Sequence, residues 1–331
     1  MREDKQLYMT NRFLLCMFAL GLFNNSSALA STTEGGKMND NSWNTHYFGR
    51  FEISLPRGSE VSADYKLFNE NLELISKNGK SQIRNSVDQK VEELKKGRAI
   101  GTPTFYEKTV PLDNGSVLII SRLNKFRTFN VYLLTSKNTL YHMMANNISE
   151  EGLEGGIEKM RMLSNAIYFR PPQEAPPRGG FAIEAGYTML DNDKFFETIY
   201  MGAQIAGHPG TYVSLLTKSI LTQEDSLIKR FEQRQYDEAI GELVNSGAVK
   251  TLRKRERVVN NIKTEEVAVS ARTDGKQFYA FQIEYAGTIE SNTRPYIALE
   301  LGTHDKGSDF KTDEEALKFW DQVVDSLKPL P

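Results

Sequence analysis

The chain has 331 residues, which is enough for about two domains of ordinary size. Its 41 Lys and Arg against 43 Asp and Glu leave a formal net charge of -2, so no charge excess directs the molecule toward nucleic acid or anionic lipid. With 39% hydrophobic and 25% charged residues, the composition is typical of a globular protein and excludes a disordered chain.

The first thirty residues are typical of an export signal. Lys5 and Arg12 form a basic start, and residues 13–23 are an apolar run too short to span a bilayer core of about 30 Å. Ala28-Leu29-Ala30 supplies the small residues that a signal peptidase requires, which predicts cleavage after Ala30 and a periplasmic location. A buried helix or a membrane anchor is the alternative. The only cysteine, Cys16, lies inside this signal, so we expect no disulfide in the mature protein.

Composition shifts along the chain divide it further. Residues 31–42 are polar and predict a flexible lead-in. Residues 171–180 (PPQEAPPRGG) contain four prolines, which favour a stiff extended linker. We therefore expect an N-terminal domain at 43–170 and a C-terminal domain at 181–331. No later segment approaches twenty apolar residues, so stable membrane insertion is not expected.

Hydrophobic spacing predicts the elements in chain order, and their order repeats in the two halves. The first half is expected to contain a strand within 48–56, a helix at 83–94, four strands at 104–110, 116–123, 129–135 and 140–145, and a helix at 153–167. The second is expected to contain a strand at 181–187, a helix at 227–244, four strands at 249–259, 265–272, 277–285 and 296–301, and a helix at 316–327. Capping boxes are predicted at Thr222 with Asp225 and at Thr312 with Glu315.

Runs of strands that do not alternate with helices indicate an α+β fold. We expect two similar domains, each an antiparallel sheet with two main helices, joined by the Pro-rich linker. A groove between such domains is a common binding place.

Catalytic signatures are absent from the sequence. It has no nucleophile elbow, phosphate-binding loop or zinc-binding helix motif. The four histidines, His46, His142, His208 and His304, are far apart, and each is interpreted as a surface or hydrogen-bonded side chain. We therefore predict no catalytic residue, cofactor or metal. A Ser-His-Asp site assembled from distant positions stays open as an alternative.

Two charged or aromatic features are candidate contacts for a protein partner. Arg253, Arg255 and Arg257 alternate along one predicted strand and would share a face suited to carboxylates. The alternative is a solvated face with local Glu partners. Phe126 and Arg127 lie near a predicted turn and are residue types that often anchor interfaces, although most aromatic residues nearby are expected to be core.

Short motifs point to a family. Residues 177–186 (PRGGFAIEAG) and 207–210 (GHPG) resemble the start of the C-terminal domain of the type VI secretion lipase immunity proteins, the family cognate to the fourth class of type VI lipase effectors. Residues 49–56 (GRFEISLP) are similar to the opening of that family's N-terminal domain. Ala182 stands where the family often has Cys.

The resemblance implies a periplasmic protein whose two α+β domains bind an incoming phospholipase effector and block its substrate entrance. Two other classes of function stay open. One is an exported hydrolase that uses His142 or His208. The other is a small-ligand or lipid-binding protein that uses the interdomain cleft.

Overall fold

The computed structural model describes residues 43–97, 104–190, 195–233 and 249–331. The predicted signal peptide and lead-in, and much of the helix predicted at 227–244, lie outside these ranges. The described residues group into one compact unit.

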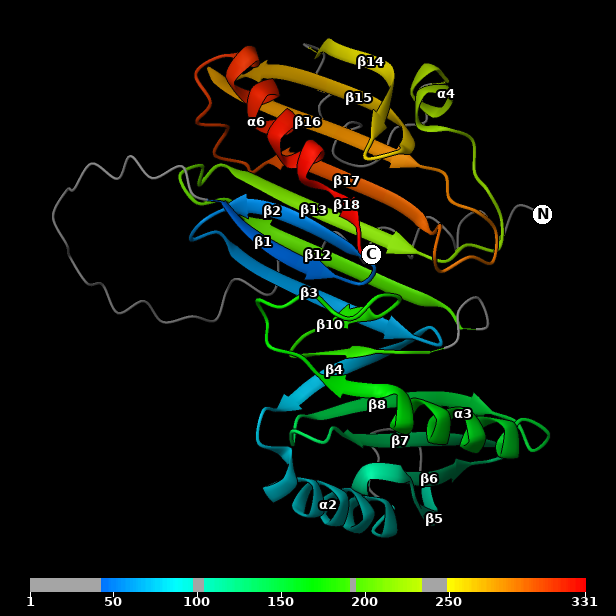
Figure 1. Cartoon of the computed structure of the whole chain (residues 1–331). Coiled ribbons are helices and arrows are strands. Elements are labelled where there is room, and N and C mark those ends of the chain that lie inside the picture. The colour runs from blue at the N-terminus through cyan, green and yellow to red at the C-terminus, as the bar shows by residue number, and fades with distance from the viewer. Residues whose placement is uncertain (1–42, 98–103, 191–194, 234–248) are drawn as a thin grey trace, which may run out of the picture. The chain divides into compact units, whose positions relative to one another are not determined.

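An antiparallel sheet of twelve strands runs through the described part of the chain (Figure 1). Its order is β14-β15-β16-β17-β13-β12-β3-β4-β8-β7-β6-β5. The bounds in the first half are β3 (Glu60–Leu67), β4 (Glu70–Ser76), β5 (Phe105–Pro111), β6 (Val117–Leu123), β7 (Phe126–Leu134) and β8 (Leu140–Ile148). Those in the second are β12 (Glu197–Gln204), β13 (Thr211–Lys218), β14 (Val249–Val259), β15 (Ile262–Thr273), β16 (Lys276–Tyr285) and β17 (Tyr296–Thr303).

The strand order repeats, because β3-β4-β8-β7-β6-β5 corresponds to β12-β13-β17-β16-β15-β14. The halves meet where β3 pairs along its whole length with β12. The sheet is much narrower between β3 and β4, which pair only from Tyr65 with Leu72 to Leu67 with Glu70. The structure thus shows an α+β fold whose sheet continues across both halves. The predicted division into two domains at 170 and 181 stays a prediction.

Two small sheets lie at the centre, and each takes strands from both halves. One contains β1 (Trp43–Phe48), β2 (Phe51–Pro56) and β18 (Lys328–Pro329), and the other β9 (Ile167–Phe169), β10 (Phe181–Ile183) and β11 (Gly186–Thr188). Each half therefore sends its last strand to the hairpin of the other, since β18 pairs with β2 and β9 with β11.

The single strands predicted at 48–56 and 181–187 are in fact parts of these hairpins. The chain turns at Gly49 and at Ala185, both with positive φ. Backbone hydrogen bonds between Gly49 and Ala182 of 2.7 and 2.9 Å connect the two hairpins. Apolar alternation continues through each turn, so the hydrophobic pattern alone does not show where the strand ends.

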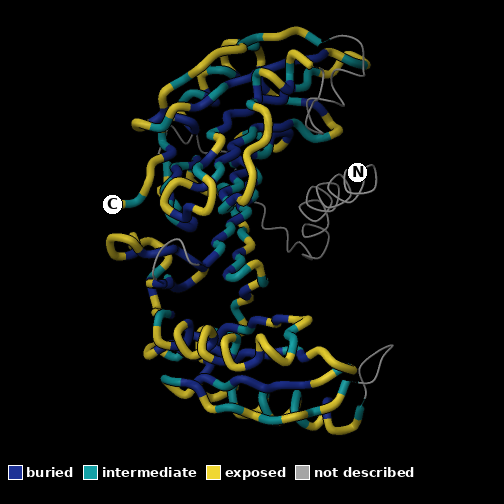
Figure 2. Tube along the Cα trace, turned by 90° about the vertical axis from the view of Figure 1, so that its right-hand side faces the viewer, coloured by how far each residue is buried: buried dark blue, intermediate teal, exposed yellow. Residues whose placement is uncertain are grey.

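Helices pack on both faces of the sheet. Those described are α2 (Ile83–Lys95), α3 (Leu153–Ala166), α4 (Leu227–Glu232) and α6 (Asp313–Ser326). The apolar sides of α3 and α6 join the main core, whereas α2 and α4 cover smaller clusters formed by the opposite face of β6–β8 and of β15–β16. Figure 2 shows buried residues along the strands and exposed residues along the outer sides of the helices.

The N-termini of α6 and α4 can be compared with the two predicted capping boxes. The Thr312 hydroxyl accepts a hydrogen bond of 3.1 Å from the Glu315 N–H, which confirms Thr312 as the cap of α6, whereas the Glu315 carboxylate accepts from the Lys311 N–H at 2.8 Å. The box at Thr222 is wrong, because Ser226 caps α4 and accepts from the Lys229 N–H. Asp225 instead forms an ion pair of 2.7 Å with the Lys229 ammonium, so its carboxylate is engaged one residue before the N-cap Ser226.

The Pro-rich segment 171–180 contains turns but neither helix nor strand. It is fastened to distant parts of the chain. The Gly179 carbonyl accepts from Arg50, the Gly179 N–H donates to the Pro331 carbonyl, and Pro176 is buried. These contacts hold the segment against the small sheets.

His142 makes the stability of this fold depend on pH. Its Nε2 atom is buried without a hydrogen-bond partner, and burial lowers the pKa of the imidazole below its ordinary value of 6.5. The folded state thus favours neutral His142, so its contribution to stability is complete above pH 6.5 and is lost as the pH falls below that value. Urea unfolding at pH 7.5 and 5.5 should show a smaller acid loss in His142→Gln than in the original chain. Equal losses would contradict this assignment.

Candidate protein-binding surfaces

The three predicted arginines of β14 share a face, and that face is occupied by carboxylates of the chain itself. Glu266 of β15 is fully buried and accepts from Arg253 at 3.2 Å and from Arg255 at 2.6 Å, with Arg257 at 3.5 Å. Arg253, Arg255 and Arg257, together with the carboxylates that they contact, are called the arginine cluster below. The local Glu partner that the alternative interpretation of this strand requires is therefore present.

Helix α6 supplies the other acids of the arginine cluster. Asp321 contacts Arg253 at 2.6 Å and Arg257 at 2.8 Å, and the Trp320 indole donates to Glu266 at 3.0 Å. Burial opposes ionisation of Asp321, but the two guanidinium groups outweigh it and hold the pKa of this carboxyl below its ordinary value. The cluster therefore fastens α6 to the sheet. Arg255 keeps 48% of its side chain exposed, and contact of these residues with a partner stays a prediction.

Phe126 and Arg127 begin β7 directly after the turn at Asn124, and their environments differ. Phe126 is 38% exposed, whereas Arg127 is buried between Glu107 at 2.9 Å and Glu150 at 2.7 Å. The role of this pair in partner binding also stays a prediction.

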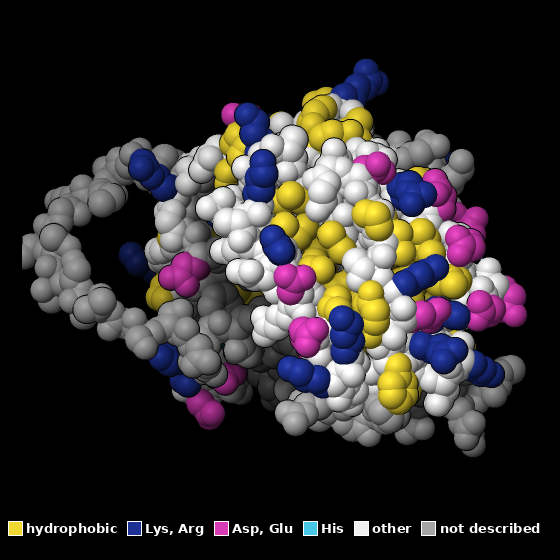
Figure 3. All heavy atoms as spheres, turned by 90° about the horizontal axis from the view of Figure 1, so that it is seen from below, with side chains coloured by type: hydrophobic (Ala, Val, Ile, Leu, Met, Phe, Trp, Pro, Cys, Tyr) yellow, Lys and Arg dark blue, Asp and Glu magenta, His cyan; other side chains and the backbone are white. Residues whose placement is uncertain are grey.

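Phe105, at the same end of the sheet, is 57% exposed on the edge strand β5. Figure 3, which views this end from below, shows hydrophobic side chains gathered in the middle of the face with charged side chains around them. Such a surface is of the kind that protein partners cover.

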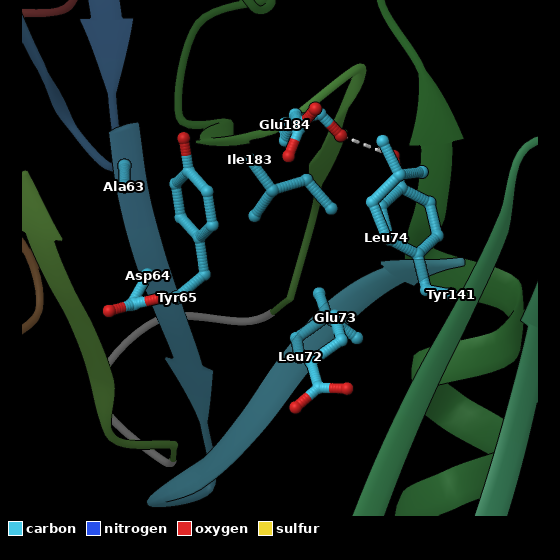
Figure 4. Close-up of a pocket in the computed structure, with 9 residues that line it drawn as sticks. All are labelled: Ala63, Asp64, Tyr65, Leu72, Glu73, Leu74, Tyr141, Ile183 and Glu184. Carbon is cyan, nitrogen blue, oxygen red and sulfur yellow. Dashed lines mark hydrogen bonds between the residues drawn. The ribbon is translucent and has the colours of Figure 1, made fainter. Parts of the chain in front are cut away.

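A cavity of about 170 Å³ opens where β3 and β4 diverge, beside the turn between β10 and β11 (Figure 4). It is called the β3–β4 cavity below. Its lining comprises Ala63, Asp64, Tyr65, Leu72, Glu73, Leu74, Tyr141, Ile183 and Glu184. This cavity was not predicted from the sequence, because β3 and β4 were not predicted. The alternation of residues 60–67 between exposed polar and buried apolar side chains was the available signal.

The buried Arg170 supports this cavity from the β9 side. Its guanidinium donates to the carbonyl oxygens of Ile183 at 3.0 Å and Gly186 at 3.1 Å, and to those of Pro171, Pro172 and Glu174. The Tyr141 hydroxyl donates to the Glu184 carbonyl at 2.7 Å, so the β10–β11 turn is held from two sides. Burial raises the pKa of both Tyr65 and Tyr141.

The four histidines show no arrangement for nucleophilic catalysis. His208 contacts Asp309 at 2.8 Å and His304 contacts Gln204 at 2.7 Å, and no described Ser or Thr hydroxyl is hydrogen-bonded to any histidine ring. The described residues contain no group of three His, Cys, Asp or Glu side chains placed to hold a metal ion. Of the helices that the structure describes, none has the length and apolar content to cross a bilayer.

Comparison with known proteins gives a match to one protein family. Residues 174–331 match the family described as Tle cognate immunity protein 4 C-terminal domain. The C-terminal part of the chain is therefore similar to this family, which is described as one of immunity proteins. No curated protein matches the chain.

Solved structures extend the similarity to most of the chain. One is the apo structure of the immunity protein TplEi of the type VI secretion system from Pseudomonas aeruginosa, at 25% identity and a TM-score of 0.79 over 89% of this chain and 99% of that one. A chain in the crystal structure of a Tle4–Tli4 complex matches at 25% identity and a TM-score of 0.78, with the same coverage. TplEi complexed with an "L" peptide matches at 25% identity and a TM-score of 0.73, over 88% of this chain and 100% of that one.

Proposed function

We propose that this chain is a periplasmic immunity protein that binds a cognate type VI secretion phospholipase effector and inhibits it by covering its substrate entrance. The observation that carries the proposal is the match, over 89% of this chain and 99% of the other, to a chain in a complex named for an effector and its immunity protein. The export signal predicted in residues 1–30 supports the periplasmic location.

Inhibition by occlusion needs a large and stable interface rather than a reactive group. A standard protein interface buries about 1,600 Å² in total, and a lasting block of an enzyme requires at least that area. The candidate contacts are the exposed parts of the arginine cluster, Phe126 with Arg127, and the β3–β4 cavity.

A lipid-binding function has less support from the described residues. The β3–β4 cavity of about 170 Å³ is smaller than the roughly 300–1,000 Å³ of sites for small organic ligands. It suits one side chain of a protein partner better than a lipid molecule.

Inhibition of the phospholipase encoded beside this chain tests the proposal. We expect the two purified proteins to coelute on gel filtration and phospholipase activity to fall to background once the immunity protein is equimolar. The control is a phospholipase effector of another class, which should stay active. Separate elution with full activity would contradict the proposed function.

A further inference from the structure

We propose that α2 is a displaceable cover, a helix that opens away from β6–β8 while the rest of the fold stays intact, and that its opening hydrates a row of buried polar atoms. Three features support this inference. The ends of α2 lack local stabilisation, few of its side chains are buried, and the sheet face beneath it holds polar atoms without partners. The inference does not rest on the proposed function.

The N-terminus of α2 lacks the local stabilisation that α6 has. Gln82 precedes α2 without capping a backbone N–H through its side chain, and the first turn has no acidic residue. Helix α6 is of nearly the same length, but it begins at the Thr312 cap and has three acidic residues in its first turn. Because an uncapped helix of 13 residues is marginal in water, α2 depends on its packing against the sheet.

The packing of α2 is limited as well. Leu94 is the only buried residue of this helix, whereas α3 and α6 each bury five. Ile83, Val87 and Val91 are partly buried against a small apolar cluster that is separate from the main core. Elements with few buried apolar contacts are those that open at low free energy, so α2 has the features of such an element.

The sheet face on which α2 packs holds three buried polar atoms without a hydrogen-bond partner within the described residues. They are Ser121 Oγ on β6, Asn130 Oδ1 on β7 and His142 Nε2 on β8. Asn130 lies opposite Ile119, and His142 lies opposite Tyr132. Both Ile119 and Tyr132 belong to the cluster that α2 covers, and Ser121 shares their face because it follows Ile119 by two residues.

Contacts with α2 reach both ends of this polar row. Lys95 lies over the ring of Tyr106, which pairs with Ser121 between β5 and β6. At the other end, the Lys90 ammonium opposes protonation of His142. A buried polar group without a partner is costly, and contact with water removes that cost. Closure of α2 therefore carries a penalty that its opening relieves.

Native-state hydrogen exchange of the full chain is the first test. After correction for intrinsic rates, we expect the amides of α2 to exchange together and at least about a hundredfold faster than those of α3. Helix α3 is the matched reference because it has 14 residues against 13. Low urea concentrations should change the exchange of α2 little, because a local opening exposes little surface. Equal protection of α2 and α3 would overturn the inference.

Removal of one unpaired hydroxyl is the second test. Ser121→Ala deletes a buried group that has no partner and adds no volume, so we expect α2 to exchange about fivefold more slowly in this variant. Ser62→Ala is the matched control, because it makes the same change at an exposed position on β3 and should leave the exchange of α2 unaltered. Unchanged exchange of α2 in Ser121→Ala would overturn the inference.

Discussion

Replacing Glu266 by Gln is expected to lower the free energy of unfolding by about 3 kcal/mol, the scale observed when one partner of a buried ion pair is removed. Glu266 is fully buried and lies within 3.5 Å of Arg253, Arg255 and Arg257. The variant keeps the size of the side chain and an oxygen for the Trp320 indole. It removes the negative charge that offsets the guanidinium groups, which then repel one another under α6.

Urea unfolding followed by Trp fluorescence measures this loss. Glu256→Gln is the matched control, because it makes the same change on β14 at an exposed position. We expect its free energy of unfolding to stay within about 0.5 kcal/mol of the original value. Equal stability of the two variants would contradict this prediction, because Asp321, and Asp325 at 2.6 Å from Arg257, would then suffice to hold the arginine cluster.

Replacing Arg170 by Met should have an effect of similar size, for a different reason. Met fills much of the same space but donates no hydrogen bond. The buried carbonyls of Ile183 and Gly186 would lose this donor, and each buried group left unpaired costs about 1–3 kcal/mol. We expect a total loss of at least about 3 kcal/mol and faster hydrogen exchange in the β10–β11 turn.

The same segment offers a control for this second variant. Arg178 is exposed, so Arg178→Met should leave both stability and hydrogen exchange nearly unchanged. Fast exchange confined to the ends of the sheet in Arg170→Met, with the β10–β11 turn still protected, would show that Arg170 does not hold the turn.

Elements set by local sequence were predicted well. Each of these elements shows its helical or strand periodicity within its own residues. They are the helices α2, α3 and α6 and the strands β5–β8 and β14–β17. Two turns between these strands also depend on their own residues, since Asn138 and Asp274 adopt positive φ, which Asn and Asp tolerate.

Strands that are stabilised by partners far away in the sequence were not predicted. β3, β4, β12 and β13 were not predicted, although β3 and β12 join the two halves of the sheet. On β3 the alternation of residues 60–67 is typical of a strand, but its pairing partner β12 lies more than a hundred residues away and no local pattern indicates it. The β3–β4 cavity and the bonds of Arg170 depend on these pairings, so no short motif indicated them.

The exchange of final strands has a consequence for how the molecule is made. β2 near the start of the chain is completed by β18, and the Ser326 hydroxyl donates to the Ser54 carbonyl across the same contact. A polypeptide emerging from a ribosome or a translocation pore therefore keeps its earliest hairpin incomplete until its last residues are released. Nascent chains stalled before α6 should accordingly remain sensitive to protease at residues 43–56.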